Sequence, residues 1–289
     1  MELTLHKQIR ENAPLRKSFD ALAQKTFGIS FEGWYRAGHW SDSYIPYVLA
    51  EGDTVLANAS VNVMDFLWCG QSRRYIQIGT VMTEETHRNR GLSRRLITAI
   101  LADWKDRCDT VYLFANDSAL NFYPKFGFCK AQEYQYSMQL PDGTGSAKKI
   151  NMEKQDGQAL LRSQYGLSNP FSALQMTKNY GLIAFYCLSS LKDCVYYSKA
   201  HDAVIIAAQE DGVLDCYDVF GGKGFSLAEV LSSVADAQTT SVRLGFTPLE
   251  TAGCTAAPYR EEDTTLFVLS GKENIFTGSR VLFPLLSHA

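Results

Sequence analysis

The chain has 289 residues, 46% of them hydrophobic, which is more than one ordinary core requires and predicts two domains. Its 28 basic and 31 acidic residues are nearly balanced, which excludes the broad basic surface typical of nucleic-acid binding. No apolar run is long enough to cross a bilayer, and residues 1–7 lack a basic-then-apolar signal region. We therefore expect a cytoplasmic protein with neither a nucleic acid nor a membrane as its partner.

The first 82 residues are expected to form helical segments followed by a meander of strands. A helix is expected at 12–27, and a short helical or turn segment at 31–40. Strands at 47–50 and 55–66 flank a turn at 51–53, and a third strand at 74–82 follows a turn at 69–71. The third strand alternates in polarity, so one of its faces is expected in the core and the other along a cleft.

An arginine-rich loop then leads into a well-patterned helix. From Leu92 the apolar residues recur at three- and four-residue spacing, at Leu92, Leu96, Ile97, Ile100, Leu101 and Trp104. The preceding loop and first turn read Arg88, Asn89, Arg90, Gly91, Leu92 and Ser93, and more arginines follow at 94 and 95. A helix N-terminus attracts anions, and glycine lets the backbone approach a bulky one, so the loop predicts a phosphate site. The alternative is that these arginines form the solvated face of an exposed helix.

A second motif gives this loop a more specific interpretation. The pattern Arg-x-x-Gly-x-small at 88–93 resembles the acyl-CoA pyrophosphate loop of the GNAT superfamily of N-acetyltransferases. Another motif of that family, Asn-x-x-Ala-x-x-Phe-Tyr-x-x-x-Gly-Phe, matches residues 116–128, after an expected strand at 110–115. Ser93 departs from the usual glycine or alanine, and Pro124 requires the second motif's helix to be short or kinked near Tyr123. Gly127 suits a left-handed helix end.

The resemblance implies an activity, a cosubstrate and site residues. It implies transfer of an acetyl group from acetyl-CoA to a primary amine of a small molecule or peptide, by direct attack in a ternary complex. CoA would be bound by Val81, Met82, Thr83, Asn116 and the loop 88–93, with the Val81 amide also stabilising the oxyanion. Tyr123 would protonate the departing thiolate, or alternatively only pack on the cofactor. No metal is expected, because the scattered cysteines show no ligand spacing.

The residue that accepts the amine proton has several candidates. Three lie near the phosphate loop, where a solvated role is favoured: Glu84, Glu85 and His87. Four others belong to the segment that would line the acceptor side: His39, Trp40, Asp42 and Tyr44. His39 itself is expected at the surface between two turns. The sequence assigns neither the acceptor nor the oligomeric state.

The second half repeats the order of elements in the first. Strands at 203–209 and 213–220, a glycine loop at 221–224, a helix at 227–235 and a strand at 241–246 follow one another. The glycine loop contains only one cation, Lys223, so we expect a degenerate, non-catalytic domain; the alternative is a generic strand–helix–strand unit whose helix is capped by Ser226.

The expected fold class is therefore α/β (α+β), with a mixed, mostly antiparallel GNAT-type sheet flanked by helices, followed by a second, smaller GNAT-like α/β domain. The expected domains are a catalytic acyl-CoA-binding domain at 1–140, a turn-rich linker at 141–157 and the second domain at 158–289.

Two other functions compete with the acetyltransferase. One is a non-catalytic, acyl-CoA-binding regulator whose acceptor cleft is closed. The other is a tandem-domain transferase that uses charged tRNA as its donor, which the neutral first half and the CoA-type loop disfavour.

Overall fold

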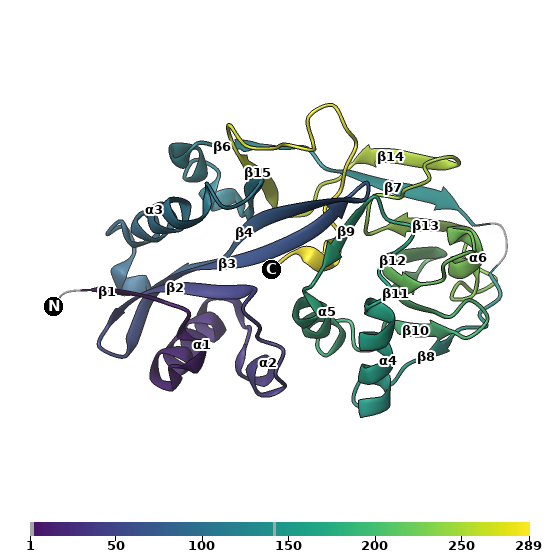
Figure 1. The fold of residues 1–289 in the computed structure, drawn as a ribbon, viewed down its shortest axis with the longest axis horizontal. Helices are drawn as coiled ribbons and strands as arrows, with labels where there is room; N and C mark the ends of the chain where they lie inside the picture. Colours follow the sequence, from purple (N-terminus) through teal and green to yellow (C-terminus); the bar gives the residue numbers. More distant parts are fainter. Residues whose placement is uncertain (1–2, 141–142) are drawn as a thin grey trace.

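The computed structural model describes residues 3–140 and 143–289, which form two sheets with helices packed against them (Figure 1). In the first sheet the strand order is β1-β2-β3-β4-β5-β15-β6, and β9 pairs with β3. The bounds are β1 (Thr4–Lys7), β2 (Tyr44–Glu51), β3 (Thr54–Trp68), β4 (Gln71–Thr83), β5 (Thr110–Ala115), β6 (Phe128–Lys130), β9 (Leu174–Thr177) and β15 (Thr265–Leu269). Only β4 and β5 pair in parallel; the other pairs are antiparallel.

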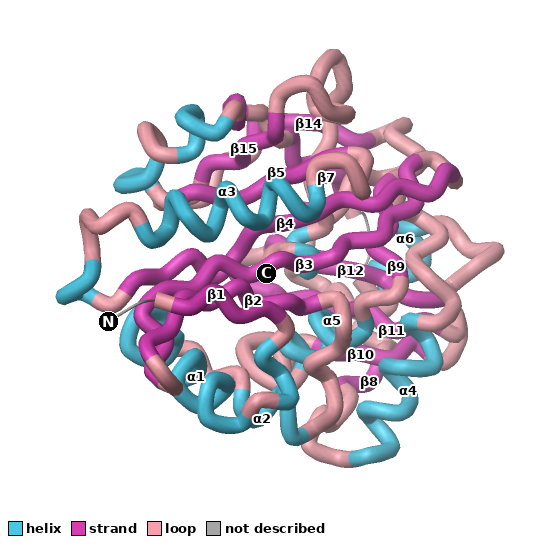
Figure 2. Tube along the Cα trace, turned by 60° about the vertical axis from the view of Figure 1, so that its left-hand side comes forward, coloured by secondary structure: helices cyan, strands magenta, loops and turns pink. Residues whose placement is uncertain are grey.

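Helices cover both faces of the first sheet (Figure 2). The helices α1 (Ala13–Phe27) and α2 (Glu32–Arg36) lie on one face, and α3 (Leu92–Trp104) lies on the other. Apolar side chains of α1 pack on Val48 and Val55, whereas those of α3 pack on Leu49 and Ala57. Because neighbouring strand residues point to opposite faces, this alternation places one helix layer on each side.

Local sequence signals explain where these elements begin and end. Asn12 caps α1 by accepting a hydrogen bond from the Leu15 amide at 3.2 Å, and Gly28 ends the helix with a φ of 71°. The expected helices and the meander are confirmed. Pro124 divides the second motif into 3-10 turns at Asp117–Ala119 and Tyr123–Phe126, and Gly127 ends them with a φ of 87°.

The second sheet has the strand order β14-β7-β13-β12-β11-β10-β8. Its bounds are β7 (Tyr134–Gln139), β8 (Lys148–Lys149), β10 (Val195–Ser198), β11 (Ala203–Glu210), β12 (Val213–Gly221), β13 (Ser241–Leu244) and β14 (Cys254–Pro258). The accompanying helices are α4 (Gln155–Tyr165), α5 (Tyr180–Cys187) and α6 (Leu227–Ser232). The mixed α/β fold class, with antiparallel-rich sheets and a second α/β unit, is confirmed.

The two sheets share one connectivity. Strand β11 pairs antiparallel with β12, which pairs parallel with β13 after α6, just as β3, β4 and β5 are related around α3. A capping box formed by Ser226 and Glu229 starts α6, as the generic interpretation expected. That the second unit is a degenerate GNAT domain stays a prediction.

Strand pairing crosses the expected domain boundaries in both directions. Strand β7, which precedes residue 140, lies in the second sheet, and β15 returns to lie between β5 and β6 of the first. The expected linker at 141–157 contains β8 and the start of α4; its residues 141 and 142 lie outside the described residues. The expected division into domains at 1–140 and 158–289 therefore stays a prediction.

One hydrophobic cluster joins the two sheets. It contains Phe66 and Tyr75 from the first sheet, Ile206 and Phe220 from the second, and Phe283 from the C-terminal segment. The Phe283 ring stacks on Tyr112 with centroids 4.1 Å apart. The residues after β15 therefore lie in the junction, as Figure 1 shows for the yellow end of the chain. No helix among the described residues is long and apolar enough to span a membrane.

A buried carboxyl group at this junction predicts a pH-dependent stability. Glu133 is 6% exposed and accepts a hydrogen bond from the Phe283 amide at 2.9 Å. Burial raises its pKa to about 8, further aided by the charge of Glu261. Because the folded state binds this proton more tightly than the unfolded state, stability falls as the pH rises towards 8.

We expect Glu133→Gln to reduce the loss of stability between pH 6 and 9 by about 2 kcal/mol, since the amide has no proton to lose. Urea unfolding at the two pH values measures the difference. Burial also raises the pKa of Asp218 to about 7, so the free energy of unfolding of this variant still falls somewhat as the pH rises. The exposed Glu153→Gln is the control, and equal slopes in both variants would contradict the assignment.

Candidate active site

Strands β4 and β5 separate at the centre of the first sheet. The two strands pair only between Tyr75–Thr110 and Ile78–Leu113. Beyond Ile78, β3 is the only described strand that pairs with β4. A bulge between Asn58 and Ser60 shifts the register, and Thr80 has a φ of 49°, a left-handed conformation. The side-chain nitrogen of Asn58 stabilises this bend by donating a hydrogen bond to the Thr80 carbonyl oxygen at 2.7 Å. The separation leaves an open edge at Val81.

The arginine loop forms a cationic cavity of about 600 Å³ at the start of α3. Gly91 is the N-cap residue with a φ of 77°, and no side chain caps this helix in the described structure. The first amides of α3 therefore remain available to an anion. Arg88, Arg94 and Lys125 line the cavity and supply its positive charge. This geometry suits a phosphate or pyrophosphate group.

A second cavity, of about 540 Å³, continues from the first along the gap between β4 and β5. Ser93 and Phe122 line both cavities, and Ser93 also shares a hydrogen bond of 3.1 Å with the Thr83 hydroxyl. Val81 on β4 and Asn116, which directly follows β5, both line the second cavity. The two cavities therefore form one groove from the helix N-terminus to the centre of the sheet.

Tyr123 lies along this groove as the first residue of the 3-10 turn that contains Pro124. Its side chain is 5% exposed and contacts the rings of Phe122, Phe128 and Phe267 with centroids 5.2, 6.2 and 6.1 Å apart. Burial raises the pKa of its phenol to about 12. The phenol is therefore protonated at neutral pH and can donate a proton to an anion formed in the groove.

The structure brings most of the predicted cofactor residues together. Eight of them line the two cavities: Val81, Thr83, Arg88, Asn89, Gly91, Leu92, Ser93 and Asn116. Arg90 is exposed on the loop and is not among the lining residues, and the Met82 side chain is buried in the cluster beneath α1. The predicted roles of all these residues remain proposals.

The residues considered as acceptors of the amine proton lie in different parts of the structure. Glu84 pairs with Lys25 at 2.6 Å, which lowers its pKa, and Asp42 is exposed and pairs with Arg10. The expectation that His39 lies at the surface is wrong: it is 8% exposed, and its ring packs edge-on against Tyr180. Packing of α5 against the 39–40 segment covers it, a contact that local sequence does not show. His87 lines the cavity at the start of α3, and Tyr44 lines a third cavity that adjoins the groove.

Two features of the site were not predicted. Lys125 adds a cation to the cavity at the start of α3, beside the expected Arg88 and Arg94. Gly79 packs against the last residues of the sequence, since a Cβ there would lie 2.3 Å from the carbonyl oxygen of Ala289. No local signal could place the 285–289 segment against β4, because the contact joins residues more than 200 positions apart.

Comparison with known proteins agrees with this geometry. The family model for the acetyltransferase (GNAT) family matches residues 15–128 of this chain. No curated protein matches the chain at a significant level.

Several solved structures share the fold over most of the chain. A GCN5-related N-acetyltransferase from Kribbella flavida is 14% identical with a TM-score of 0.56, over 92% of this chain and 71% of that one. A probable N-acyltransferase from Enterococcus faecalis is 14% identical with a TM-score of 0.57, over 93% and 71%. Eis1 from Mycobacterium abscessus is 14% identical with a TM-score of 0.55, over 91% and 73%. At these identities the likeness concerns the fold, and it extends to both sheets.

Proposed function

We propose that the protein is an N-acetyltransferase that transfers an acetyl group from acetyl-CoA to a primary amine by direct attack in a ternary complex. The observation that carries the proposal is the continuous groove, which begins at the cationic start of α3 and ends beside Tyr123. Its cationic start and the polar and apolar residues that follow suit a pyrophosphate and then a pantetheine arm. The family match at 15–128 supports the cosubstrate.

Different residues of the groove have different roles in the proposed reaction. The loop 88–93 and Arg94 bind the pyrophosphate, and the open edge of β4 at Val81 pairs with the amide groups of the pantetheine arm. The Val81 amide stabilises the oxyanion that forms when the amine attacks the thioester carbonyl. Tyr123 then donates its proton to the thiolate.

Atoms and charges balance over the cycle. A C–N bond forms, the C–S bond breaks, and the nitrogen loses one proton while the departing thiolate gains one from the phenol. The proton lost by the nitrogen restores the phenol through solvent. The products are an acetamide and CoA with a free thiol, and the proposed step needs no metal ion.

A thiol-release assay with acetyl-CoA and a panel of amines tests the proposal. We expect release of the CoA thiol that depends on both acetyl-CoA and amine, together with an acetylated amine that mass spectrometry identifies. Saturable acetyl-CoA binding without any acetylated amine would instead favour the regulatory, non-catalytic alternative. Absence of acetyl-CoA binding would exclude both functions.

A further inference from the structure

A third cavity, of about 630 Å³, adjoins the groove on the side away from the arginine loop. Phe27, Thr80 and Ala289 line both this cavity and the one that contains Tyr123. Its volume falls in the range of pockets that bind small molecules. A molecule in this cavity would therefore meet the thioester near the bend of β4, and the chemistry of the walls indicates which amine it is.

Six aromatic side chains contribute to the cavity wall: Phe27, Phe31, Trp34, Tyr44, Phe185 and Tyr186. Phe31 is central among them: its ring stacks on Tyr44 with centroids 5.3 Å apart and on Phe185 at 6.0 Å. Trp34 meets Phe185 edge-on at 6.1 Å. These rings come from α2, β2 and α5, so both halves of the chain build the wall. Such walls favour flat apolar ligands, which stack on the ring faces or meet their edges.

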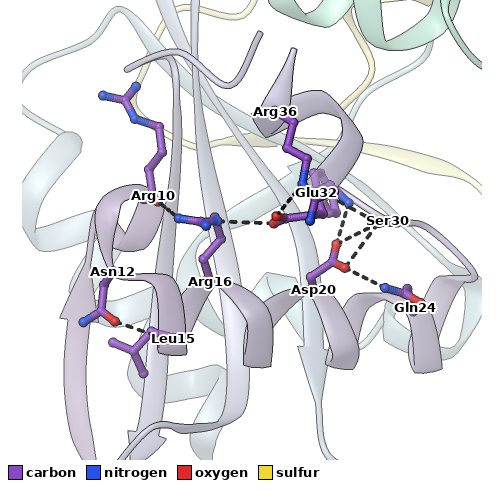
Figure 3. Close-up of polar contacts among 10 residues, drawn as sticks. Arg10, Asn12, Leu15, Arg16, Asp20, Gln24, Ser30, Glu32 and Arg36 are labelled. Carbon is purple, nitrogen blue, oxygen red and sulfur yellow. Dashed lines mark hydrogen bonds and ion pairs between the residues drawn. The ribbon is translucent and has the colours of Figure 1, made fainter. Parts of the chain in front are cut away.

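The wall is fixed in place by polar contacts outside the cavity. Asp20 is 7% exposed and accepts hydrogen bonds from the Phe31 amide at 2.6 Å, from the Ser30 hydroxyl and from Gln24 (Figure 3). On the opposite side the Trp34 indole donates to the Gly181 carbonyl oxygen at 2.7 Å. The aromatic wall is therefore preorganised, which lowers the entropic cost of binding.

The network around α2 keeps its charges away from the cavity. Glu32 accepts from Arg16 at 3.3 Å and from Arg36 at 3.1 Å, and Arg16 also donates to the Arg10 carbonyl oxygen (Figure 3). Among the described residues that line the cavity, none is aspartate, glutamate, lysine or arginine. A polycation would consequently lose its hydration there without gaining an acidic side-chain partner.

The environment of His288 disfavours a positive charge. It lines the cavity, its ring lies 3.9 Å from that of Phe114, and burial lowers its pKa to about 3. The imidazole is therefore neutral at pH 7, and its Nε2 has no hydrogen-bond partner in the described structure. The Asn62 amide nitrogen, also in the wall, is likewise unpartnered. The wall thus offers a few polar atoms for orienting a single polar group.

We infer that the acceptor is an aromatic monoamine, which binds with its ring among Phe31, Trp34 and Phe185 and its amino group towards Thr80. This inference rests on the proposed acetyltransferase function and names its substrate class. The chemistry is the transfer described above, with the amine nitrogen as the attacking atom. An arylamine and an arylalkylamine share this recognition chemistry, and the experiment separates them.

Equilibrium binding and turnover are both measured with the full chain. Calorimetry in the presence of CoA, which cannot react, uses an anisidine, tryptamine, spermidine and an aminoglycoside as probes. Turnover with acetyl-CoA is measured for the same amines. We expect both aromatic monoamines to bind saturably, and at least one to be acetylated with a kcat/KM at least about 10-fold above that of either polycation.

Three variants test the cavity itself. Phe185→Ala is expected to weaken binding of the aromatic probes about 10-fold, because it removes one ring from the wall. Ser190→Asp places a carboxylate at the exposed rim and is expected to improve spermidine turnover relative to tryptamine. Phe225→Ala is the control, since this exposed ring packs on His201 in the second unit and does not line the cavity.

The outcomes separate this inference from the proposed function. Acetylation of a polycation in preference to both aromatic amines overturns the inference and leaves the acetyltransferase function intact. The inference is also overturned if neither aromatic amine binds saturably, or if Phe185→Ala and Phe225→Ala behave alike. Failure to bind acetyl-CoA overturns the proposed function. If the aromatic amines still bind and Phe185→Ala weakens their binding, the cavity remains assigned as a site for aromatic amines.

Discussion

Gly91→Glu is expected to abolish the stabilisation of the protein by acetyl-CoA. At a concentration 100 times its Kd, a ligand adds about 2.7 kcal/mol to the free energy of unfolding, or roughly 5 °C in Tm for a chain of this size. Glutamate at the N-cap of α3 would direct a carboxylate towards the pyrophosphate site that we propose at Arg88 and the first amides of the helix. Repulsion between the two anions then removes the binding energy.

The substitution has a second effect that a matched control removes. Gly91 has a φ of 77°, which strains any residue with a side chain, so the Tm of the free variant also falls. Gly253 precedes β14, has the same φ of 77° and also has open space around its Cβ position. Gly253→Glu therefore reproduces the strain and the charge away from the groove. The measured quantity is the Tm difference with and without acetyl-CoA, and a full shift in Gly91→Glu would refute the pyrophosphate assignment.

Local sequence predicts the parts of the site whose geometry is set by neighbouring residues. The start of α3 follows from apolar periodicity and from Gly91, and the interruption at Tyr123 follows from Pro124. Together these signals place the phosphate loop and Tyr123 on the correct elements. The opening between them follows from the bulge at Thr80. The sequence gives no signal for this bulge, because a left-handed threonine is rare and is stabilised here by the side chain of Asn58.

The remaining parts depend on contacts between distant segments. β15 lies between β5 and β6 although about 150 residues separate it from β5, and no local periodicity specifies the partner of a strand. The cavity proposed for the acceptor likewise combines the 27–34 segment with α5 and the residues 288–289. His39 shows the consequence: its own neighbours suggest a surface turn, whereas α5 buries it. Sequence alone therefore predicts the elements around the start of α3 better than the walls of the cavity proposed for the acceptor.

Tyr123→Phe is expected to lower kcat by a factor of about 100 or more while leaving acetyl-CoA binding nearly unchanged. The ring contacts with Phe122, Phe128 and Phe267 remain in the variant, so the groove retains its shape. Only the proton for the leaving thiolate is lost, and general-acid catalysis typically contributes 10²–10⁴-fold. Single-turnover acetyl transfer is the appropriate measurement, because it reports the chemical step even when product release limits kcat.

The single-turnover rate of Tyr123→Phe, measured over a range of pH, distinguishes a proton donor from a ring that only packs on the cofactor. Burial raises the Tyr123 pKa to about 12, so the phenol of the folded enzyme remains protonated at pH 10. Wild-type transfer should therefore show no decrease due to this group between pH 8 and 10, and the deficit of Tyr123→Phe should be constant over that interval. Tyr197→Phe, which removes a phenol bonded to Asp202 in the second sheet, should leave the rate unchanged. Equal single-turnover rates for Tyr123→Phe and the wild type would show that Tyr123 only packs on the cofactor, and the thiolate would then take its proton from solvent.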